Sequence, residues 1–179
     1  MRSALLIIDV QRALFDDAPR PFEADLVVER INALATRARH AGIPVVFVQH
    51  ETKAGNLRFG SDGWQLEQGL LLEDGDTVLR KTTPDSFLHT ELSSLLALWE
   101  VEQLVICGYA SEFCVDTTTR RAAALGFPVT LVSDAHTTHD KAHASAAEIR
   151  RHHNMTLPDI SSFGVTIQTL PSAQVVFAL

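Results

Sequence analysis

Short apolar runs alternate along this chain with segments of helical period. The runs end in polar or glycine-containing residues, which is typical of buried parallel strands, and they lie at Ala4–Ile8, Val45–Val48, Thr77–Lys81, Leu104–Cys107, Val129–Val132 and Gly164–Ile167. Between Phe22 and His40, apolar residues recur at spacings of three and four, which predicts an amphipathic helix. Further helices are predicted at Glu91–Trp99, from Cys114 to a stop at Gly126, and at Ala142–Met155.

Two junctions between a helix and a strand have the same design. Ala41–Val45 reads Ala-Gly-Ile-Pro-Val and Leu125–Val129 reads Leu-Gly-Phe-Pro-Val, so each places a helix-ending glycine before a proline that cannot continue the helix. Repeated units of this kind predict a parallel sheet covered by helices. We therefore expect an α/β protein with a three-layer αβα Rossmann-like fold, a mostly parallel sheet of roughly six strands, and a single domain over residues 1–179.

The segment Glu51–Asp76 interrupts this alternation. It contains five glycines and no clear periodicity, and long loops of this kind in compact domains are either functional lids or disordered. We expect it to determine specificity.

Composition and charge argue against several classes of function. The 179 residues are 46% hydrophobic and 21% charged, with a net charge of −7, so the chain lacks the basic surface of a nucleic-acid-binding protein. The first apolar run holds five residues and ends in Asp9, which is unlike a signal peptide, and no stretch is long enough to span a bilayer. These features predict a cytoplasmic protein with no nucleic-acid or membrane partner, whose two cysteines are free thiols.

Three chemically distinct side chains are expected at one edge of the predicted sheet. Asp9 and Lys81 end strands, and Cys114 begins the helix that follows another strand. With Ser111 as its N-cap, that helix would hold Cys114 in its first turn, where the helix dipole favours a thiolate. An acid, a cation and a thiol form the set that nucleophilic catalysis requires. Each also has a structural alternative: an inert core cysteine, a capping aspartate or a solvated lysine. Cys107, inside a strand, fits the core better.

Several ordered motifs resemble the isochorismatase-like cysteine hydrolases over nearly the whole chain. They are Leu6–Gln11, Arg80-Lys81 with Ser86-Phe87, Gly108–Arg120, Gly126–Val129 and Ser133–His136. The resemblance implies that Asp9, Lys81 and Cys114 form a catalytic triad, and that a cis peptide joins Tyr109 to Ala110. It further implies an oxyanion hole built from the amides of Ala110 and Cys114. The activity implied is cleavage of a small amide, ureido or carbamoyl substrate through a thioester, without a cofactor, in a homo-oligomer.

Other residues could contact the substrate or bind a metal. A second group of residues could contact substrate, and it consists of Gln11, Phe15, His50, Trp64, Phe87 and Phe113. Nicotinamidases carry an Asp-x-His pair after the second strand, whereas the stretch Gln49–Thr52 keeps one histidine and lacks that pair. His136, His139 and His143 have spacings that could place them on one helical face, but their sequence context indicates a loop. We expect no metal.

Two other functions stay open at this point. One is hydrolysis of the vinyl ether of isochorismate, which relies on the acid and does not need the thiol. The other is a non-catalytic thiol module, a redox sensor or binding domain, which leaves Asp9 and Lys81 unexplained.

Overall fold

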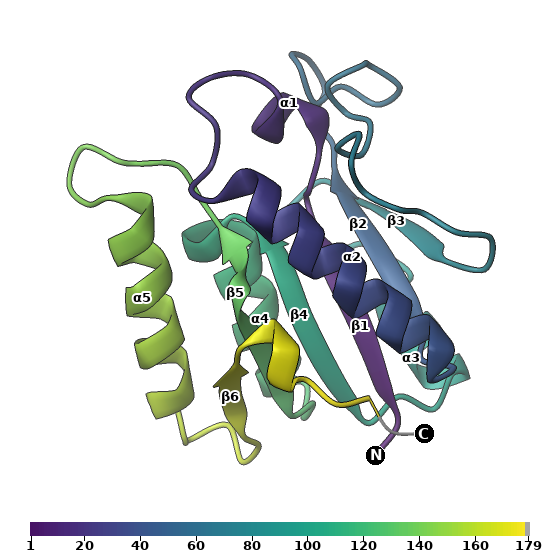
Figure 1. Ribbon diagram of the computed structural model, residues 1–179. Coiled ribbons are helices and arrows are strands. Elements are labelled where there is room, and N and C mark those ends of the chain that lie inside the picture. The colour runs from purple at the N-terminus through teal and green to yellow at the C-terminus, as the bar shows by residue number, and fades with distance from the viewer. Residues whose placement is uncertain (178–179) are drawn as a thin grey trace.

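A six-stranded parallel sheet forms the centre of the structure, a computed structural model that describes residues 1–177 (Figure 1). Its strand order is β3-β2-β1-β4-β5-β6. The strands are β1 (Ser3–Ile8), β2 (Val45–His50), β3 (Thr77–Lys81), β4 (Gln103–Tyr109), β5 (Val129–Thr137) and β6 (Ile167–Leu170). All five pairings are parallel, so the predicted α/β fold is confirmed, with a sheet that is wholly rather than mostly parallel.

Helices cover both faces of this sheet. They are α1 (Arg12–Phe15), α2 (Ala24–His40), α3 (Leu92–Leu98), α4 (Asp116–Ala124) and α5 (Ala146–Thr156), together with a π-helix, η1 (Ser111–Val115), and two short 3₁₀ turns, η2 (Leu157–Asp159) and η3 (Ser172–Gln174). Because side chains alternate along a strand, Leu5 and Ile7 pack on the α2 face while Leu6 packs on the face covered by α3 and α4 (Figure 1). The central strands are therefore buried on both sides, which explains their continuous apolar runs.

The two predicted junctions between helix and strand are present. The amide of Ile43 donates to the carbonyl of Ala38 at 2.8 Å, and the amide of Phe127 donates to that of Ala122 at 3.0 Å. Each bond closes the end of a helix, α2 or α4, and a proline then leads directly into β2 or β5.

Several predicted boundaries were wrong, most clearly those of α5, β6 and β5. Helix α5 begins at Ala146 and not at Ala142, because Ser145 caps it in a reciprocal arrangement with Glu148. The last strand is Ile167–Leu170, shifted towards the C-terminus from the predicted Gly164–Ile167. Strand β5 continues past Val132 to Thr137, through an irregularity in its pairing with β4.

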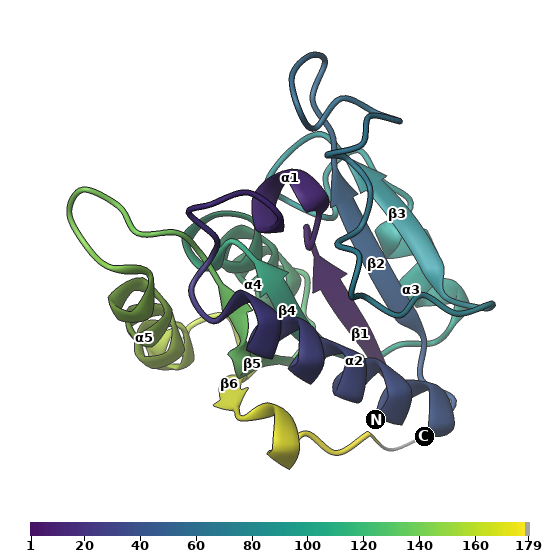
Figure 2. The ribbon, with the colours of Figure 1, turned by 45° about the horizontal axis from the view of Figure 1, so that its top comes forward.

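The segment between β2 and β3 contains neither a helix nor a named strand. It lies against α1, since the amides of Arg12 and Ala13 donate to the carbonyls of Gln65 and Gly63, each at 2.9 Å (Figure 2). Its far end is held to α2 by the ion pair of Arg39 with Asp76. The part of this loop around Gly63 and Gln65 therefore lies beside the carboxyl ends of the strands, and its far end returns to the opposite edge to begin β3.

Candidate active site

The three predicted catalytic residues lie at the carboxyl edge of the sheet, at or just after the ends of β3, β1 and β4. Lys81 is the last residue of β3, Asp9 follows β1, and Cys114 lies in η1 directly after β4. His50 ends β2, which lies between β3 and β1. Four consecutive strands thus supply one group each to this edge, where open parallel sheets bind ligands.

Lys81 and Asp9 form a buried ion pair. The Lys81 Nζ lies 2.8 Å from Asp9 Oδ2, and the two side chains are 0% and 2% exposed. The same ammonium lies 3.1 Å from both the Nδ1 of His50 and the carbonyl oxygen of Thr83. Its three N–H groups therefore have three acceptors, which offsets much of the cost of burying the charge.

The Lys81 ammonium also sets the state of His50. An ammonium group can only donate, so His50 accepts at Nδ1 and carries its proton at Nε2. Burial, followed by the charge of Lys81, lowers the pKa of His50. At neutral pH His50 is therefore an uncharged ring that offers one N–H donor.

The thiol of Cys114 completes the cluster. Its sulfur, a carboxylate oxygen of Asp9 and a ring nitrogen of His50 all lie within 4.8 Å of one another. Burial, followed by the negative charge of Asp9, raises the pKa of Cys114 to about 12, whereas Lys81 acts in the opposite direction. Burial and the carboxylate thus act against the thiolate that the helix dipole was expected to favour.

Asp9 is the group that could take the proton from Cys114. Its Oδ2 is held by Lys81, and its buried Oδ1 has no hydrogen-bond partner within residues 1–177. Buried carboxylate oxygens without partners are costly, and this one is left able to accept a proton or a hydrogen bond from a ligand. The cluster therefore holds a protonated thiol beside an unoccupied proton acceptor.

The turn that carries Cys114 differs from the prediction. It is a π-helix capped by Ala110, so Ser111 is its first residue and not its cap, and the Ser111 hydroxyl pairs with Nδ1 of His136 at 2.7 Å. The amides of Phe113 and Val115 both donate to the Ala110 carbonyl, at 3.0 and 3.1 Å. The peptide bond between Tyr109 and Ala110 is cis, at the position that the resemblance implies.

Gly108 brings β4 and β1 unusually close together just before this turn. Its φ is +117°, and a Cβ at this position would overlap the backbone of Ile8, the residue before Asp9. Substituting alanine should therefore strain the backbone and push η1, which carries Cys114, away from Asp9.

We expect Gly108→Ala to lower the free energy of unfolding by roughly 2–5 kcal/mol, from strain and overpacking together. Gly75→Ala is the matched control, because Gly75 has a φ of +99° but open space around its missing Cβ. Urea denaturation of both variants separates strain from overlap. Equal losses in the two proteins would contradict a tight approach at Gly108.

Gln11 and His50, two of the six predicted substrate contacts, join the elements that form the site. Gln11 donates through Nε2 to the carbonyls of His50 and Trp64, at 2.9 and 2.8 Å, and accepts from the His50 amide at 2.9 Å. It therefore joins β1, β2 and the long loop. His50 lies in the cluster itself. Trp64 is half-buried and packs edge-on against Phe59, and its buried Nε1 has no partner within residues 1–177.

The three phenylalanines have different surroundings. Phe15 is 0% exposed and Phe87 is 6% exposed, and they belong to the cores on opposite faces of the sheet. Phe113 is exposed and lies beneath the Lys141 ammonium. In this arrangement Phe15 and Phe87 act as packing residues and offer little surface to a ligand.

Two further groups that hold the site had little or no signal in the sequence. The carbonyl of Thr83 holds Lys81, and Gln49 donates to the Trp64 carbonyl at 2.8 Å. Any residue type has a main-chain carbonyl, so the sequence could not indicate the role of Thr83. Gln49 was visible only as a polar residue that interrupts an apolar strand.

The residues able to hold a metal are those of the cluster. Within residues 1–177, Asp9, His50 and Cys114 are the group of His, Cys, Asp or Glu whose ligand atoms approach one another closely enough. The Lys81 ammonium already donates to two of the three, so a divalent cation would have to displace it. His136 and His139 instead form hydrogen bonds, to Ser111 and Tyr109, each at 2.7 Å.

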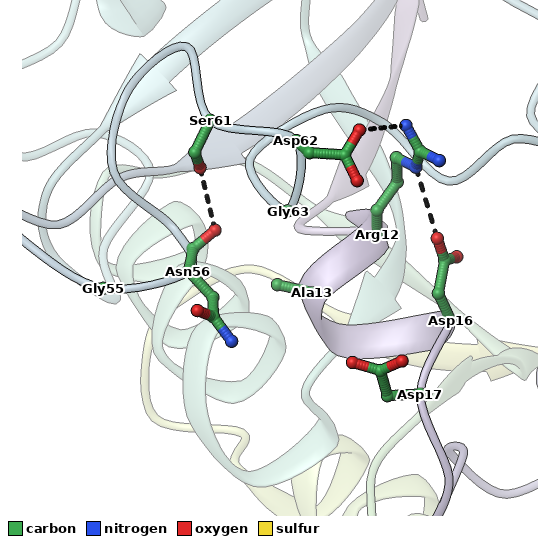
Figure 3. Close-up of a pocket in the computed structure, with 9 residues that line it drawn as sticks. All are labelled: Arg12, Ala13, Asp16, Asp17, Gly55, Asn56, Ser61, Asp62 and Gly63. Carbon is green, nitrogen blue, oxygen red and sulfur yellow. Dashed lines mark hydrogen bonds and ion pairs between the residues drawn. The ribbon is translucent and has the colours of Figure 1, made fainter.

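A polar pocket opens between α1 and the long loop (Figure 3). Its volume is about 360 Å³, and its walls carry Arg12, Asp16, Asp17, Asn56 and Asp62. Arg12 spans the rim and pairs with both Asp16 and Asp62. The closeness of α1 to Asp9 in sequence places this pocket at the carboxyl edge of the sheet, on the loop side.

Comparison with known proteins places the chain in a family. A family model described as the Isochorismatase domain matches residues 3–162. A streptothricin hydrolase of Streptomyces noursei is 41% identical over 140 residues, which cover 76% of this chain and 50% of that protein. The uncharacterized isochorismatase family protein YddQ of Bacillus subtilis (strain 168) is 31% identical, with coverage of 75% and 77%.

The fold agrees with this assignment. A solved isochorismatase family protein superposes with a TM-score of 0.84 at 35% identity, covering 94% of this chain and 97% of its own. The chain spans about half the length of the streptothricin hydrolases that it matches. In residues 1–177 no helix is long and apolar enough to cross a membrane, and the cytoplasmic location stays a prediction. On its sequence match and its fold together, this chain belongs to the isochorismatase family.

Proposed function

We propose that this chain is a cysteine hydrolase that cleaves a C–N bond of a small amide, ureido or carbamoyl substrate through a thioester on Cys114. One observation carries the proposal: a protonated thiol lies beside a buried carboxylate that has one oxygen held by Lys81 and the other without a partner. The similarity to a protein named streptothricin hydrolase supports hydrolysis as the class of reaction.

The first half of the reaction forms the thioester. Asp9 accepts the Cys114 proton as the sulfur attacks the substrate carbonyl carbon, which forms a C–S bond and an oxyanion. The amides of Ala110 and Cys114 would donate to that oxyanion. When it collapses, the C–N bond breaks and the protonated Asp9 gives its proton to the departing nitrogen, which leaves as ammonia or an amine.

The second half releases the acid. Asp9, again ionised, accepts a proton from water as the water oxygen attacks the thioester carbonyl carbon. Collapse of this second intermediate breaks the C–S bond, and the thiol recovers its proton from Asp9. Lys81 keeps the carboxylate in place through both halves and balances its charge. With a thiol pKa of about 12, attack at neutral pH depends on this adjacent base.

The charge balance of the site favours an uncharged substrate. Lys81 is paired with Asp9, and His50 and Cys114 are neutral, so the cluster carries no net charge at neutral pH. Two arginines of α1 and β3 are also paired, Arg12 with two aspartates and Arg80 with Glu51. Isochorismate is a dicarboxylate and would need free cations, so this balance favours the amide reading over vinyl-ether hydrolysis. A non-catalytic thiol module leaves the buried ion pair without a purpose.

A panel of substrates tests the proposal. The purified protein is incubated with neutral amides, ureas, carbamoyl compounds and isochorismate, and the release of ammonia or amine is measured alongside the intact protein mass. We expect turnover of at least one neutral C–N substrate and a transient acyl adduct on the Cys114 peptide after acid quenching. Turnover of isochorismate alone, without an adduct, would establish the vinyl-ether reaction instead.

We expect activity to survive exhaustive chelation, because Lys81 already supplies the positive charge beside Asp9 and His50. Added zinc should inhibit, since a thiolate, an imidazole and a carboxylate are ligands that it prefers and since binding would occupy the nucleophile. Activity is measured after chelation and then against increasing zinc. Loss on chelation with recovery on adding zinc would show a metal-dependent hydrolase.

A further inference from the structure

His136 is a buried histidine for which the proposed reaction has no role. It is 0% exposed, and both ring nitrogens have side-chain partners. Nδ1 lies 2.7 Å from the Ser111 hydroxyl, and Nε2 lies 2.8 Å from Oδ1 of Asn154. The three residues come from β5, η1 and α5, so the ring connects three separate elements.

The direction of each hydrogen bond follows from the orientation of the Asn154 amide. The Asn154 Nδ2 donates to the Ser133 carbonyl at 2.8 Å, which orients the amide so that its oxygen faces His136. An amide oxygen only accepts, so Nε2 of His136 carries the proton. Nδ1 of the neutral ring then accepts from the Ser111 hydroxyl. Burial lowers the pKa of His136 to about 4, in agreement with a neutral ring.

These three bonds form a one-way chain, here called the Ser111 relay: Ser111 donates to His136, His136 to Asn154, and Asn154 to the Ser133 carbonyl. Each of the three bonds joins one donor to one acceptor, and the last acceptor is a main-chain carbonyl that cannot reverse the direction. Buried polar networks with all members satisfied rigidify their surroundings and specify one geometry. The relay therefore holds the Ser111 hydroxyl in a single orientation.

The irregular pairing of β5 with β4 is what brings His136 to this position. Ile106 lies opposite Leu131, but Gly108, two residues on, lies opposite His136, so β5 has three more residues than β4 over this stretch. The extra residues bring His136 level with the end of β4, immediately before η1. Bulges of this kind commonly re-aim side chains next to active sites.

We propose that His136 is a positioning residue for Cys114, acting through Ser111 as a neutral ring protonated at Nε2. Ser111 is the first residue of η1 and Cys114 is the fourth, so an anchor on Ser111 fixes the turn that carries the sulfur. The role in catalysis rests on the function proposed above. The positioning of the thiol does not, because the relay acts on the turn whatever the substrate.

The central comparison is between Ser111→Ala and Ser111→Thr. Alanine removes the donor to His136, whereas threonine keeps a hydroxyl at the same atom. We expect alanine to lower kcat on the order of 10–100-fold, as a small displacement of a nucleophile does, while KM changes by less than about threefold. Threonine should restore most of kcat. The rate of Cys114 alkylation by iodoacetamide should fall with kcat, since it reports the same thiol without a substrate.

Ile149→Ala is the control for stability alone. Ile149 is buried on α5, the helix that carries Asn154, and forms no part of the relay, so its truncation should lower the melting temperature without changing kcat or the alkylation rate. If Ser111→Ala fails to fold, Asn154→Ala is the second variant. It releases Nε2 of His136, and it should reduce kcat and alkylation in the same sense by a smaller factor.

A spectroscopic measurement tests the relay in the unaltered protein. ¹⁵N chemical shifts at neutral pH should show His136 with a protonated Nε2 and an unprotonated Nδ1, assigned by comparison with His136→Gln. The opposite tautomer would overturn the proposal, as would a Ser111→Ala variant with unchanged kcat and alkylation. If no substrate is found, the alkylation rates and the tautomer still decide the positioning role, so failure of the two proposals can be told apart.

Discussion

Replacing Cys114 with alanine should abolish turnover, to below about one part in 10³ of the wild-type kcat, because no other group can form the thioester. The fold should persist. Cys114 is only partly buried at the edge of one core cluster, and the change removes a single sulfur atom. Turnover of the best substrate in the panel, together with the melting temperature, provides the measurement.

Cys107→Ala is the matched control, since it removes the chain's other thiol. Cys107 is 0% exposed inside β4, its sulfur lies 3.6 Å from the Leu6 carbonyl oxygen, and burial raises its pKa well above that of an ordinary thiol. Its loss should cost about 1 kcal/mol of stability and leave kcat nearly unchanged. Iodoacetamide should likewise modify Cys114 and spare Cys107 in the folded protein. An essential Cys107 with a dispensable Cys114 would reverse the roles of the two thiols.

The convergence of Asp9 and Lys81 could be predicted because it follows from topology. Parallel strands deliver the residues at their carboxyl ends to one edge, so two residues that end such strands share that edge before any contact is known. The Gly-x-Pro junctions were equally informative, because proline acts on its own backbone and needs no partner.

The π-helix η1, which carries Cys114, could not be predicted in the same way. A π-helix and the first turn of an α-helix place apolar residues at similar spacings, so periodicity did not separate them. The partner of Ser111 is His136, 25 residues away, and it reaches the turn only through the irregular pairing of β5. The influences that raise the pKa of Cys114 were hidden for a related reason, because a helix start is visible in a sequence while burial and a neighbouring carboxylate are not.

The aromatic residues show a further limit. Phe15 and Phe87 follow motifs of the site in sequence, yet both belong to the cores beneath it. A phenylalanine in a core and one in a pocket wall have the same composition and spacing. Only the packing of the surrounding helices distinguishes them.

Asp9→Asn should reduce kcat on the order of 10²–10⁴-fold, because an amide cannot accept the thiol proton. The backbone should accommodate the change, since Asp9 has a φ of +51° and asparagine tolerates that region as aspartate does. The amide oxygen can still accept from Lys81, so the geometry of the pair is kept.

The same substitution should make the Cys114 thiol easier to ionise. The negative charge of Asp9 raises the pKa of Cys114 to about 12 together with burial, and Lys81 lowers it. Asp9→Asn removes the charge that raises this pKa and leaves the ammonium uncompensated, so the pKa should fall and the thiolate fraction at any pH below it should rise. The pH profile of iodoacetamide alkylation should then shift towards lower pH, even though turnover is lost.

Lys81→Met completes the test, because it removes the opposite charge and keeps the length of the side chain. Without the ammonium, Asp9 and burial act on Cys114 unopposed, so its pKa should rise and alkylation should require higher pH. Both variants should lose turnover, yet they should move the alkylation profile in opposite directions. A general loss of structure would shift both profiles the same way, towards the pKa of an exposed thiol. Only a thiol that lies within the fields of both Asp9 and Lys81 gives opposite shifts, and that arrangement is the one on which the proposed mechanism depends.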